Sequence, residues 1–185
     1  RVSRLALHRD GTLLAMICAK RPAQGRPLMS EGVGLHRSSD GAETWQIVNS
    51  SRTFLYPKDF SVHPKDSRVI LVGACDSSGE DQSGGLYRTS DGGQTWERIG
   101  RQGRQTFGGY FHPKFDGSIH MTLTEGAPGA GLWLPRDNGQ TWEQFDGLPF
   151  SNIQRVVFDP RDDAVMYVTT FGGSVWRGPV VPRGE

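Results

Sequence analysis

A phrase with an aspartate turn and a closing tryptophan occurs three times in this chain: SSDGAETW at 38–45, TSDGGQTW at 89–96 and PRDNGQTW at 135–142. Its aspartates are 51 and then 46 residues apart, and its tryptophans keep the same intervals. A repeat of about 40 to 50 residues is typical of architectures whose units are stable only when stacked on their neighbours. This repeat constrains the fold more than any other feature.

Two further phrases recur at other positions of the repeating unit. One lies between two short apolar runs and reads LHRDG at 7, VHPKDS at 62, FHPKFDG at 111 and FDPRDD at 158. The other reads GLHR, GLYR, GLWL and SVWR, and its first three copies lead into the aspartate phrase. These phrases therefore predict four short strands in each unit, which we letter A to D. The His/Asp phrase forms the A–B turn and the aspartate phrase forms the C–D turn.

Four antiparallel strands per unit are the plan of a β-propeller blade. The sequence thus predicts an all-β propeller segment over 1–185, with four-stranded antiparallel blades at 3–49, 57–99, 107–145 and 152–178, the last without its D strand. The 25 glycines and 11 prolines suit short strands and are too many for long helices. An open arc would expose apolar faces. We therefore expect a larger ring, completed by further blades of the same polypeptide or by a second copy.

Composition excludes some partners. The 21 Lys and Arg residues balance 20 Asp and Glu residues without a basic block, which argues against nucleic acid. No apolar stretch approaches the roughly 20 residues needed to span a membrane. Cys18 and Cys75 fall at matching positions of neighbouring units, too far apart for a disulfide, so we expect buried free thiols.

The aspartate of each phrase is expected to accept backbone N–H groups of its own turn, while the tryptophan packs between blades. These residues resemble the Asp-box, S/T-x-D-x-G-x-T-W, of the BNR-repeat propellers. That superfamily includes sialidases, xyloglucan-type endoglucanases, sortilin-like receptors and photosystem assembly factors. The second copy matches throughout, whereas the first has Ala42 for Gly and the third has Pro135 for Ser/Thr. The box residues expected to be structural are Asp40, Trp45, Asp91, Gly93, Trp96, Asp137, Gly139 and Trp142.

Two patterns resemble metal sites but are better explained by turns. The DNG of the third box resembles part of a calcium-binding loop, yet the further oxygen ligands and the closing Glu are absent. His8, His63 and His112 occupy the same A–B turn of successive units, where the fourth unit has Asp159. A position repeated in every blade lies around a ring and does not converge on one ion. We therefore predict no metal and no cofactor.

The B–C and D–A loops differ most between units, as expected of binding loops carried on a scaffold. They mix Arg, Gln, Phe, Tyr and carboxylates, which suits sugar recognition and would also serve a peptide. Near the start of the A strands, the residues four before the turn position are Arg4, Asp59, Gly108 and Arg155. They could hold an anionic group or form an ion-pair ring that lines the channel, and we favour the ring. The candidate ligand-binding residues are Arg4, Arg52, Tyr56, Arg104, Tyr110 and Arg155.

The resemblance implies an extracellular or periplasmic propeller that recognises saccharide or polysaccharide in the manner of glycoside hydrolases. Hydrolysis would require two carboxylates about 5 to 10 Å apart. The carboxylates on the loop face are Asp59, Asp76, Glu80, Asp81 and Glu125, and the sequence selects no pair among them. The alternative is a non-catalytic, protein-binding scaffold of the sortilin or assembly-factor kind.

Overall fold

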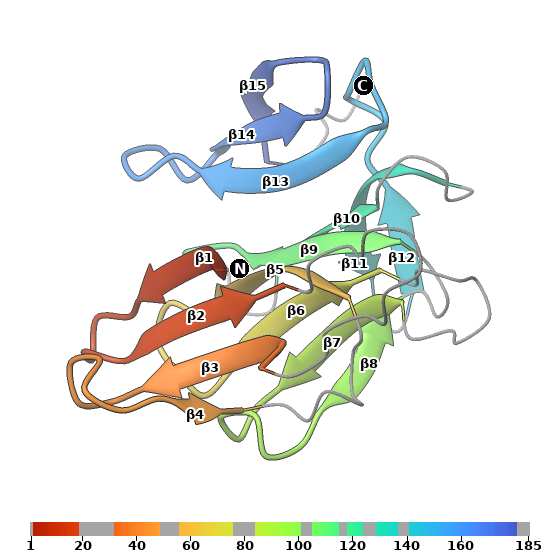
Figure 1. The fold of residues 1–185 in the computed structure, drawn as a ribbon. Coiled ribbons are helices and arrows are strands. Elements are labelled where there is room, and N and C mark those ends of the chain that lie inside the picture. Colours follow the sequence, from red (N-terminus) through yellow and green to blue (C-terminus); the bar gives the residue numbers. More distant parts are fainter. Residues whose placement is uncertain are drawn as a thin grey trace.

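The computed structural model describes residues 2–18, 32–48, 56–75, 84–100, 105–114, 118–123, 129–136 and 141–180. Within these ranges the chain forms fifteen strands and no helix (Figure 1). Blade 1 contains β1 (Val2–Leu7), β2 (Leu13–Ile17), β3 (Gly34–Ser38) and β4 (Gln46–Ile47). Blade 2 contains β5 (Pro57–Val62), β6 (Ile70–Ala74), β7 (Gly85–Thr89) and β8 (Glu97–Gly100). Blade 3 contains β9 (Thr106–Phe111), β10 (Ile119–Leu123), β11 (Gly131–Arg136) and β12 (Thr141–Gln144), and blade 4 contains β13 (Ile153–Phe158), β14 (Val165–Thr170) and β15 (Val175–Pro179).

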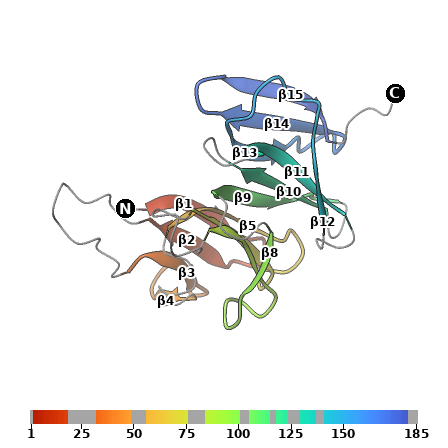
Figure 2. The same ribbon diagram turned by 90° about the vertical axis from the view of Figure 1, so that its right-hand side faces the viewer.

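Each blade is an antiparallel sheet whose strands pair in chain order. The A strands β1, β5, β9 and β13 lie nearest the shared centre, and the later strands of each blade lie further out (Figure 2). The predicted all-β architecture is confirmed, with three four-stranded sheets and a three-stranded fourth sheet among the described residues.

Alternating side chains of each sheet are buried against the next blade. Leu14, Met16 and Leu35 of blade 1 meet Phe60, Ile70 and Val72 of blade 2. The opposite face of blade 2 packs on blade 3, and blade 3 packs on blade 4 in the same manner. The core is therefore three interfaces in series, each built from the two-residue side-chain period of its strands.

The aspartate phrase forms the C–D turn of blades 1 and 2. Asp91 accepts the backbone N–H groups of Gln94 at 2.9 Å and Thr95 at 3.0 Å, together with the hydroxyls of Thr89 and Thr95. The Thr95 hydroxyl is the main cause that holds the pKa of the Asp91 carboxyl well below its usual range. Asp40 accepts the hydroxyls of Thr44 and Ser38 and the backbone N–H of Thr44, which lower its pKa to about 2. Asp137 and Gly139 lie outside the described residues.

The first box carries an alanine where the turn requires left-handed backbone. Ala42 has φ 77°, and the equivalent Gly93 has φ 97°. A side chain on left-handed backbone costs about 1–2 kcal/mol of stability. Replacing Ala42 by glycine removes this cost, but glycine has more conformational freedom in the unfolded chain, which offsets part of the gain. Ala42→Gly should therefore raise the free energy of unfolding by about 0.5–1 kcal/mol, measured from urea denaturation midpoints. Ala15→Gly, in the regular backbone of β2, is the control and should lower it.

The A–B turns use the same device in every blade. The Nδ1 atoms of His8, His63 and His112 accept the backbone N–H two residues later at 3.2 to 3.4 Å. In blade 4, Asp159 accepts the N–H of Arg161 at 2.9 Å. These histidines therefore stabilise turns, as the repeat predicts. Among the described residues, no group of three or more His, Cys, Asp or Glu side chains is placed to hold a metal ion.

His120 lies in the interface between blades 3 and 4, at the position that Leu71 occupies in blade 2. Its Nε2 lies 3.0 Å from the Val180 carbonyl oxygen, and its ring packs edge-on against Phe158. Burial lowers the pKa of His120 from 6.5 to about 4. The folded chain therefore resists protonation of this ring, whereas the unfolded chain does not.

The wild-type protein should lose about 3 kcal/mol of stability as pH falls from above 6.5 towards 4, because a tenfold change in proton affinity corresponds to about 1.4 kcal/mol. In this window the unfolded state binds the proton of His120 and the folded state does not. Urea denaturation across the window measures the effect. His120→Leu, which introduces the leucine that blade 2 has at this position, should reduce the dependence of the unfolding free energy on pH. A variant whose stability falls with pH as steeply as that of the wild type would contradict the assignment of this dependence to His120.

The two cysteines occupy equivalent positions after β2 and β6 and form no disulfide. Each thiol lies against a carbonyl at the start of the next A strand: Cys18 Sγ is 3.0 Å from the Pro57 oxygen, and Cys75 Sγ is 3.7 Å from the Thr106 oxygen. Cys75 is buried as predicted, whereas Cys18 is only half-buried. Nor do the described ranges hold any helix with the length and hydropathy of a membrane span.

Candidate functional site

A carboxylate at the centre of the arc ties the blades together. Asp59 on β5 has no exposed surface. Arg4 Nη1 on β1 donates to its two oxygens at 2.8 and 2.7 Å, and Arg155 Nε on β13 donates to Oδ2 at 2.8 Å. The Tyr110 hydroxyl on β9 donates to the same oxygen at 2.8 Å, and the Phe60 N–H donates to Oδ1 at 3.0 Å. All four A strands thus contribute to one polar cluster.

The electrostatics of this cluster favour a structural role for Asp59. Its oxygens already accept bonds from two guanidinium groups, a phenol and an amide, which leaves little capacity to serve as a general acid or base. Burial, followed by the Asp59 charge, raises the pKa of Tyr110 well above its usual value. Burial alone would lower the pKa of Arg155, but its bond to Asp59 raises it overall. The side chains of Arg4 and Arg155 remain 26% and 38% exposed, so the cluster presents a net positive charge.

The A strands share an irregularity directly beside this cluster. In each blade the pairing of the A and B strands skips one residue, five before the turn position: Ser3, Lys58, Phe107 and Gln154. Such β-bulges redirect side chains and are frequent beside functional sites. Here they direct residues of three blades towards the end of the arc where the A strands begin.

A hollow of about 290 Å³ lies at this end, and we call it the mouth hollow. It is lined by Lys58, Cys75, Gln105, Phe107, Asn152, Gln154 and Phe171. Three of these residues are the bulged residues of blades 2 to 4. Amide groups that both donate and accept hydrogen bonds, flat phenyl rings and one ammonium group suit a ligand rich in hydroxyls, since sugars present polar edges and apolar faces.

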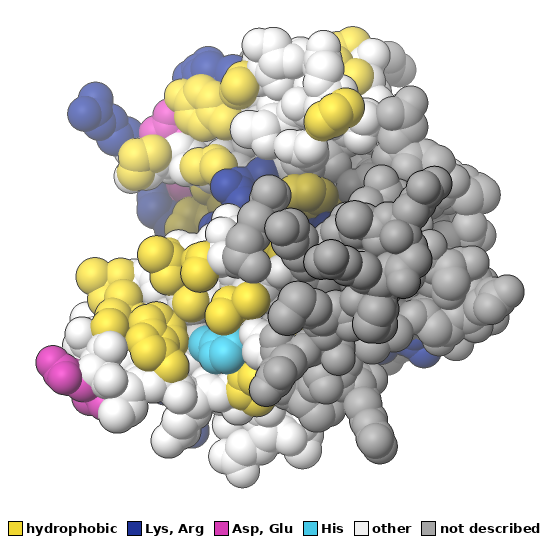
Figure 3. All heavy atoms as spheres, in the orientation of Figure 1, with side chains coloured by type: hydrophobic (Ala, Val, Ile, Leu, Met, Phe, Trp, Pro, Cys, Tyr) yellow, Lys and Arg dark blue, Asp and Glu magenta, His cyan; other side chains and the backbone are white. Residues whose placement is uncertain are grey.

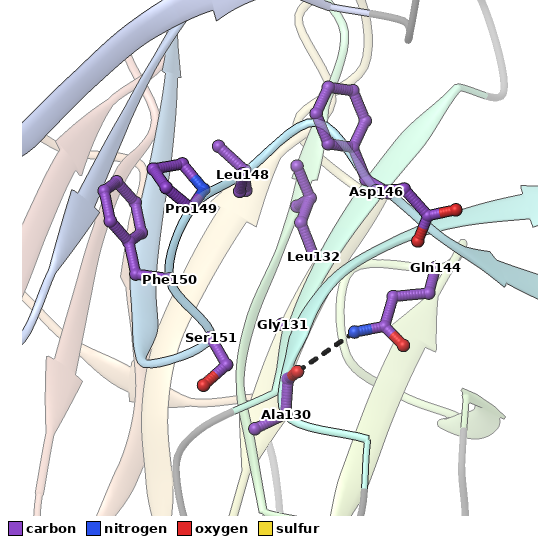
Figure 4. Close-up of a pocket in the computed structure, with 10 residues that line it drawn as sticks. Ala130, Gly131, Leu132, Gln144, Asp146, Leu148, Pro149, Phe150 and Ser151 are labelled. Atoms are coloured by element: carbon purple, nitrogen blue, oxygen red, sulfur yellow. Dashed lines mark hydrogen bonds between the residues drawn. The ribbon is translucent and has the colours of Figure 1, made fainter.

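A second hollow of about 350 Å³ lies on the same loop face, between the outer strands of blade 3 and the connection to blade 4. We call it the loop hollow, and its lining comprises Ala130, Gly131, Leu132, Gln144, Phe145, Asp146, Leu148, Pro149, Phe150 and Ser151. Figure 4 shows Leu148, Pro149 and Phe150 on one side and Gln144 and Asp146 on the other. The Gln144 amide donates to the Ala130 carbonyl at 3.2 Å. An apolar wall thus lies opposite polar groups.

The structure separates the residues predicted from sequence. Arg4, Asp59, Tyr110 and Arg155 converge in the central cluster, where Tyr110 is only 3% exposed and Asp59 fully buried. Tyr56 lies just before β5, and its carbonyl accepts the Cys75 N–H at 2.9 Å. The candidates that fall outside the described residues are Arg52, Asp76, Glu80, Asp81, Arg104 and Glu125.

The sequence indicates the loops but not the individual residues of the mouth hollow. Lys58, Gln105, Phe107 and Asn152 lie in the predicted D–A loops, whereas Gln154 lies outside them. The bulged residue is five positions before the A–B turn in every blade, so alignment on the turns groups these residues without showing that they are bulged. A bulge leaves no mark in composition, so only strand pairing reveals it.

No protein-family model matches this chain, and no curated protein matches its sequence. Solved structures do match it. The GH74 xyloglucanase from Xanthomonas campestris gives a TM-score of 0.63 at 18% identity, over 96% of this chain and 28% of that one. The GH74 enzyme of Niastella koreensis gives 0.65 at 19% identity, over 97% and 28%. YCF48 from Cyanidioschyzon merolae gives 0.61 at 13% identity, over 95% and 50%.

These structures are β-propellers, and the chain has that fold. At identities below 25% the similarity establishes the fold alone. The chain spans between 28% and 50% of the length of these three structures.

Proposed function

We propose that this chain is part of an Asp-box propeller of the extracellular or periplasmic kind, and that it binds saccharide at its loop face. The observation that carries the proposal is the mouth hollow, to which the same bulged position of three successive blades contributes an ammonium group, a phenyl ring and an amide group. The xyloglucanase of the same fold, whose name gives its substrate as a polysaccharide, supports this class of ligand. The positive central cluster beside the hollow would favour sugars that carry a carboxylate.

The proposal concerns binding and not hydrolysis. A glycosidase needs one carboxylic acid and one free carboxylate across the scissile bond. Asp59 is occupied by its ion pairs, and Asp146, the carboxylate that lines the loop hollow, lies apart from it. The catalytic pair of a hydrolase would have to include loop carboxylates outside the described residues.

Binding of xyloglucan oligosaccharides and of uronic-acid oligosaccharides, followed by calorimetry, tests the proposal. Phe171 is 73% exposed, so Phe171→Ala should leave the fold intact while it removes a ring of the mouth hollow. We expect about tenfold weaker binding, which corresponds to roughly 1.4 kcal/mol for a lost ring contact. Phe150→Ala, which removes one of the two phenyl rings that line the loop hollow, is the matched control and should bind as the wild type does.

Two results would contradict the proposal. Equal affinity of the wild type and Phe171→Ala for the oligosaccharides would exclude the mouth hollow as the binding site. No binding to any oligosaccharide, together with capture of a peptide at the loop face, would favour the protein-binding scaffold, since amides and phenyl rings also suit an extended peptide.

A further inference from the structure

One interior position differs between the blade interfaces. Leu14 on β2, Leu71 on β6 and His120 on β10 are equivalent by strand pairing. Each side chain faces the following blade, and each is at most 1% exposed. Two interfaces therefore contain leucine at a site where the third, between blades 3 and 4, contains a group that can take up a proton.

The two ring nitrogens of His120 have different surroundings. Nε2 lies 3.0 Å from the Val180 carbonyl oxygen, so Nε2 carries the proton of the neutral ring. Nδ1 is buried and has no hydrogen-bond partner within the described part of the chain. A second proton would create a charged ring whose new N–H group has no acceptor, and a buried donor of this kind is costly. The closed interface therefore favours the neutral ring.

The groups packed around His120 oppose its charged form. Phe158 of blade 4 lies edge-on between the rings of His112 and His120, with centroid distances of 4.8 and 5.0 Å. Burial is the main cause that lowers the pKa of His120, and the charge of His112 lowers it further, although the bond to the Val180 carbonyl acts in the opposite direction. Because its ring faces blade 4, His120 reaches water when blade 4 moves away from blade 3.

The nearby charges have other partners. Lys114 and Asp163 pair across the interface at 2.8 Å, and Asp159 accepts the Tyr167 hydroxyl at 2.9 Å. The charges of the central cluster lie towards the middle of the arc, where Figure 3 shows Lys and Arg side chains in the recess between blade 4 and blade 1. In the ranges that the structure describes, no carboxylate is hydrogen-bonded to His120. A charged His120 therefore requires water.

The same interface shapes the mouth hollow. Thr122 follows His120 by two residues on β10, so both side chains lie on one face of the sheet. The Thr122 hydroxyl donates to the Gln154 carbonyl at 3.0 Å, and the hydroxyl of Tyr110, the residue paired with His120, lies 3.1 Å from that carbonyl. Gln154 is one of three blade 4 residues that line the hollow, and blades 2 and 3 contribute the others. Separation of blades 3 and 4 therefore takes the hollow apart.

We propose that protonation of His120 opens the contact between blades 3 and 4 and takes the mouth hollow apart, so that acid and ligand oppose each other. The effect on a ligand rests on the proposed saccharide binding, whereas the opening does not. The closed form has its full stability above pH 6.5 and loses it as the pH falls towards 4, because the open form binds the proton more tightly. The open population should be about 30-fold larger at pH 5 than at pH 7.5.

Labelling of a buried thiol measures this opening. Val168 on β14 and Val72 on β6 are equivalent and fully buried, Val168 in the interface of blades 3 and 4 and Val72 in that of blades 1 and 2. Val168→Cys and Val72→Cys are each reacted with a thiol reagent. The rate is divided by that of the urea-unfolded chain at the same pH, which cancels the ionisation of the thiol. Peptide mass spectrometry separates the new thiol from Cys18 and Cys75.

From pH 7.5 to pH 5, the relative labelling rate of Val168→Cys should rise about 30-fold. At pH 5 it should exceed both the relative rate of Val72→Cys and the rate that global unfolding allows. Two further substitutions remove the titrating ring. His120→Gln retains an N–H donor for the Val180 carbonyl, and His120→Leu introduces the leucine of the other interfaces. In either background, Val168→Cys should lose this rise.

Equal rates for Val168→Cys and Val72→Cys at every pH would show that the arc unfolds only as a whole, and would overturn the proposal. A rise that persists in both His120 variants would overturn it as well. By linkage, an oligosaccharide at about ten times its dissociation constant should slow the labelling of Val168→Cys at pH 5 about tenfold. An oligosaccharide that binds without slowing it would separate the opening from the mouth hollow. If no oligosaccharide binds at pH 7.5, the proposed function fails, and the pH dependence of labelling still decides whether His120 controls the interface.

Discussion

Trp96→Ala is expected to lower the free energy of unfolding by about 3 kcal/mol, near the lower end of the range for truncation of a large buried aromatic. The ring packs on the interface between blades 1 and 2, and its indole N–H donates to the carbonyls of Val48 and Gly93. Truncation opens a void and leaves both carbonyls without this donor. The lower end applies because Trp96 is partly exposed. Urea denaturation with fluorescence and circular dichroism measures the loss.

Trp45→Ala is the matched control, because Trp45 is the equivalent residue of the first box and blade 1 has no preceding blade among the described residues. It should cost clearly less than Trp96→Ala. Equal losses would mean that the tryptophan acts within its own turn and not between blades. A Trp96→Ala protein that is folded but binds no saccharide would mean that the box takes part in recognition.

Asp59→Ala is expected to lower stability by about 3 kcal/mol, again at the lower end of the range for breaking a buried ion pair. The substitution removes the acceptor shared by Arg4, Arg155 and Tyr110, and it leaves two guanidinium groups facing each other. Partial exposure of both arginines lets water offset some of this repulsion. The cluster joins four A strands, so the loss should appear in the unfolding of the whole arc.

Two further variants separate the charge of Asp59 from its shape. Asp59→Asn retains the size and one acceptor oxygen, and it should cost less than Asp59→Ala. Asp163→Ala breaks the exposed pair with Lys114, at 2.8 Å, and should change stability little because surface pairs are weak. Suppose that the wild-type protein is shown to cleave a glycoside. An Asp59→Asn protein with wild-type stability and no hydrolytic activity would then identify Asp59 as catalytic.

The repeat made several elements predictable from single residues and their spacing. Asp91 and His63 satisfy backbone groups two to four residues away, so their roles depend on local sequence alone. The alignment of Arg4, Asp59 and Arg155 was visible once the turns were matched, because a repeated unit places equivalent residues at equivalent heights in a ring. The ion pairs between them then follow from opposite charge at short distance.

The mouth hollow could not be predicted in the same way. Lys58, Phe107 and Gln154 come from three blades, and they share a site only because each A strand carries a bulge at the same pairing step. A bulge depends on how two strands pair, which single-strand patterns do not record. The exposure of Leu5 and Val175 likewise depends on which blades have neighbours, since equivalent residues elsewhere in the chain are buried.

The sequence alone therefore determined the repeat, the four-strand unit, the turn chemistry and the β-propeller fold, because all of these depend on contacts within a few residues or on strict periodicity. Only the tertiary structure decided which side chains converge at the mouth, that Asp59 is fully occupied, and that His120 is buried between two blades. These properties arise from contacts between residues about 50 to 100 positions apart, such as Arg4 with Asp59 and Asp59 with Arg155. Such contacts require the stacking of whole blades, which the period predicts in kind but does not specify atom by atom.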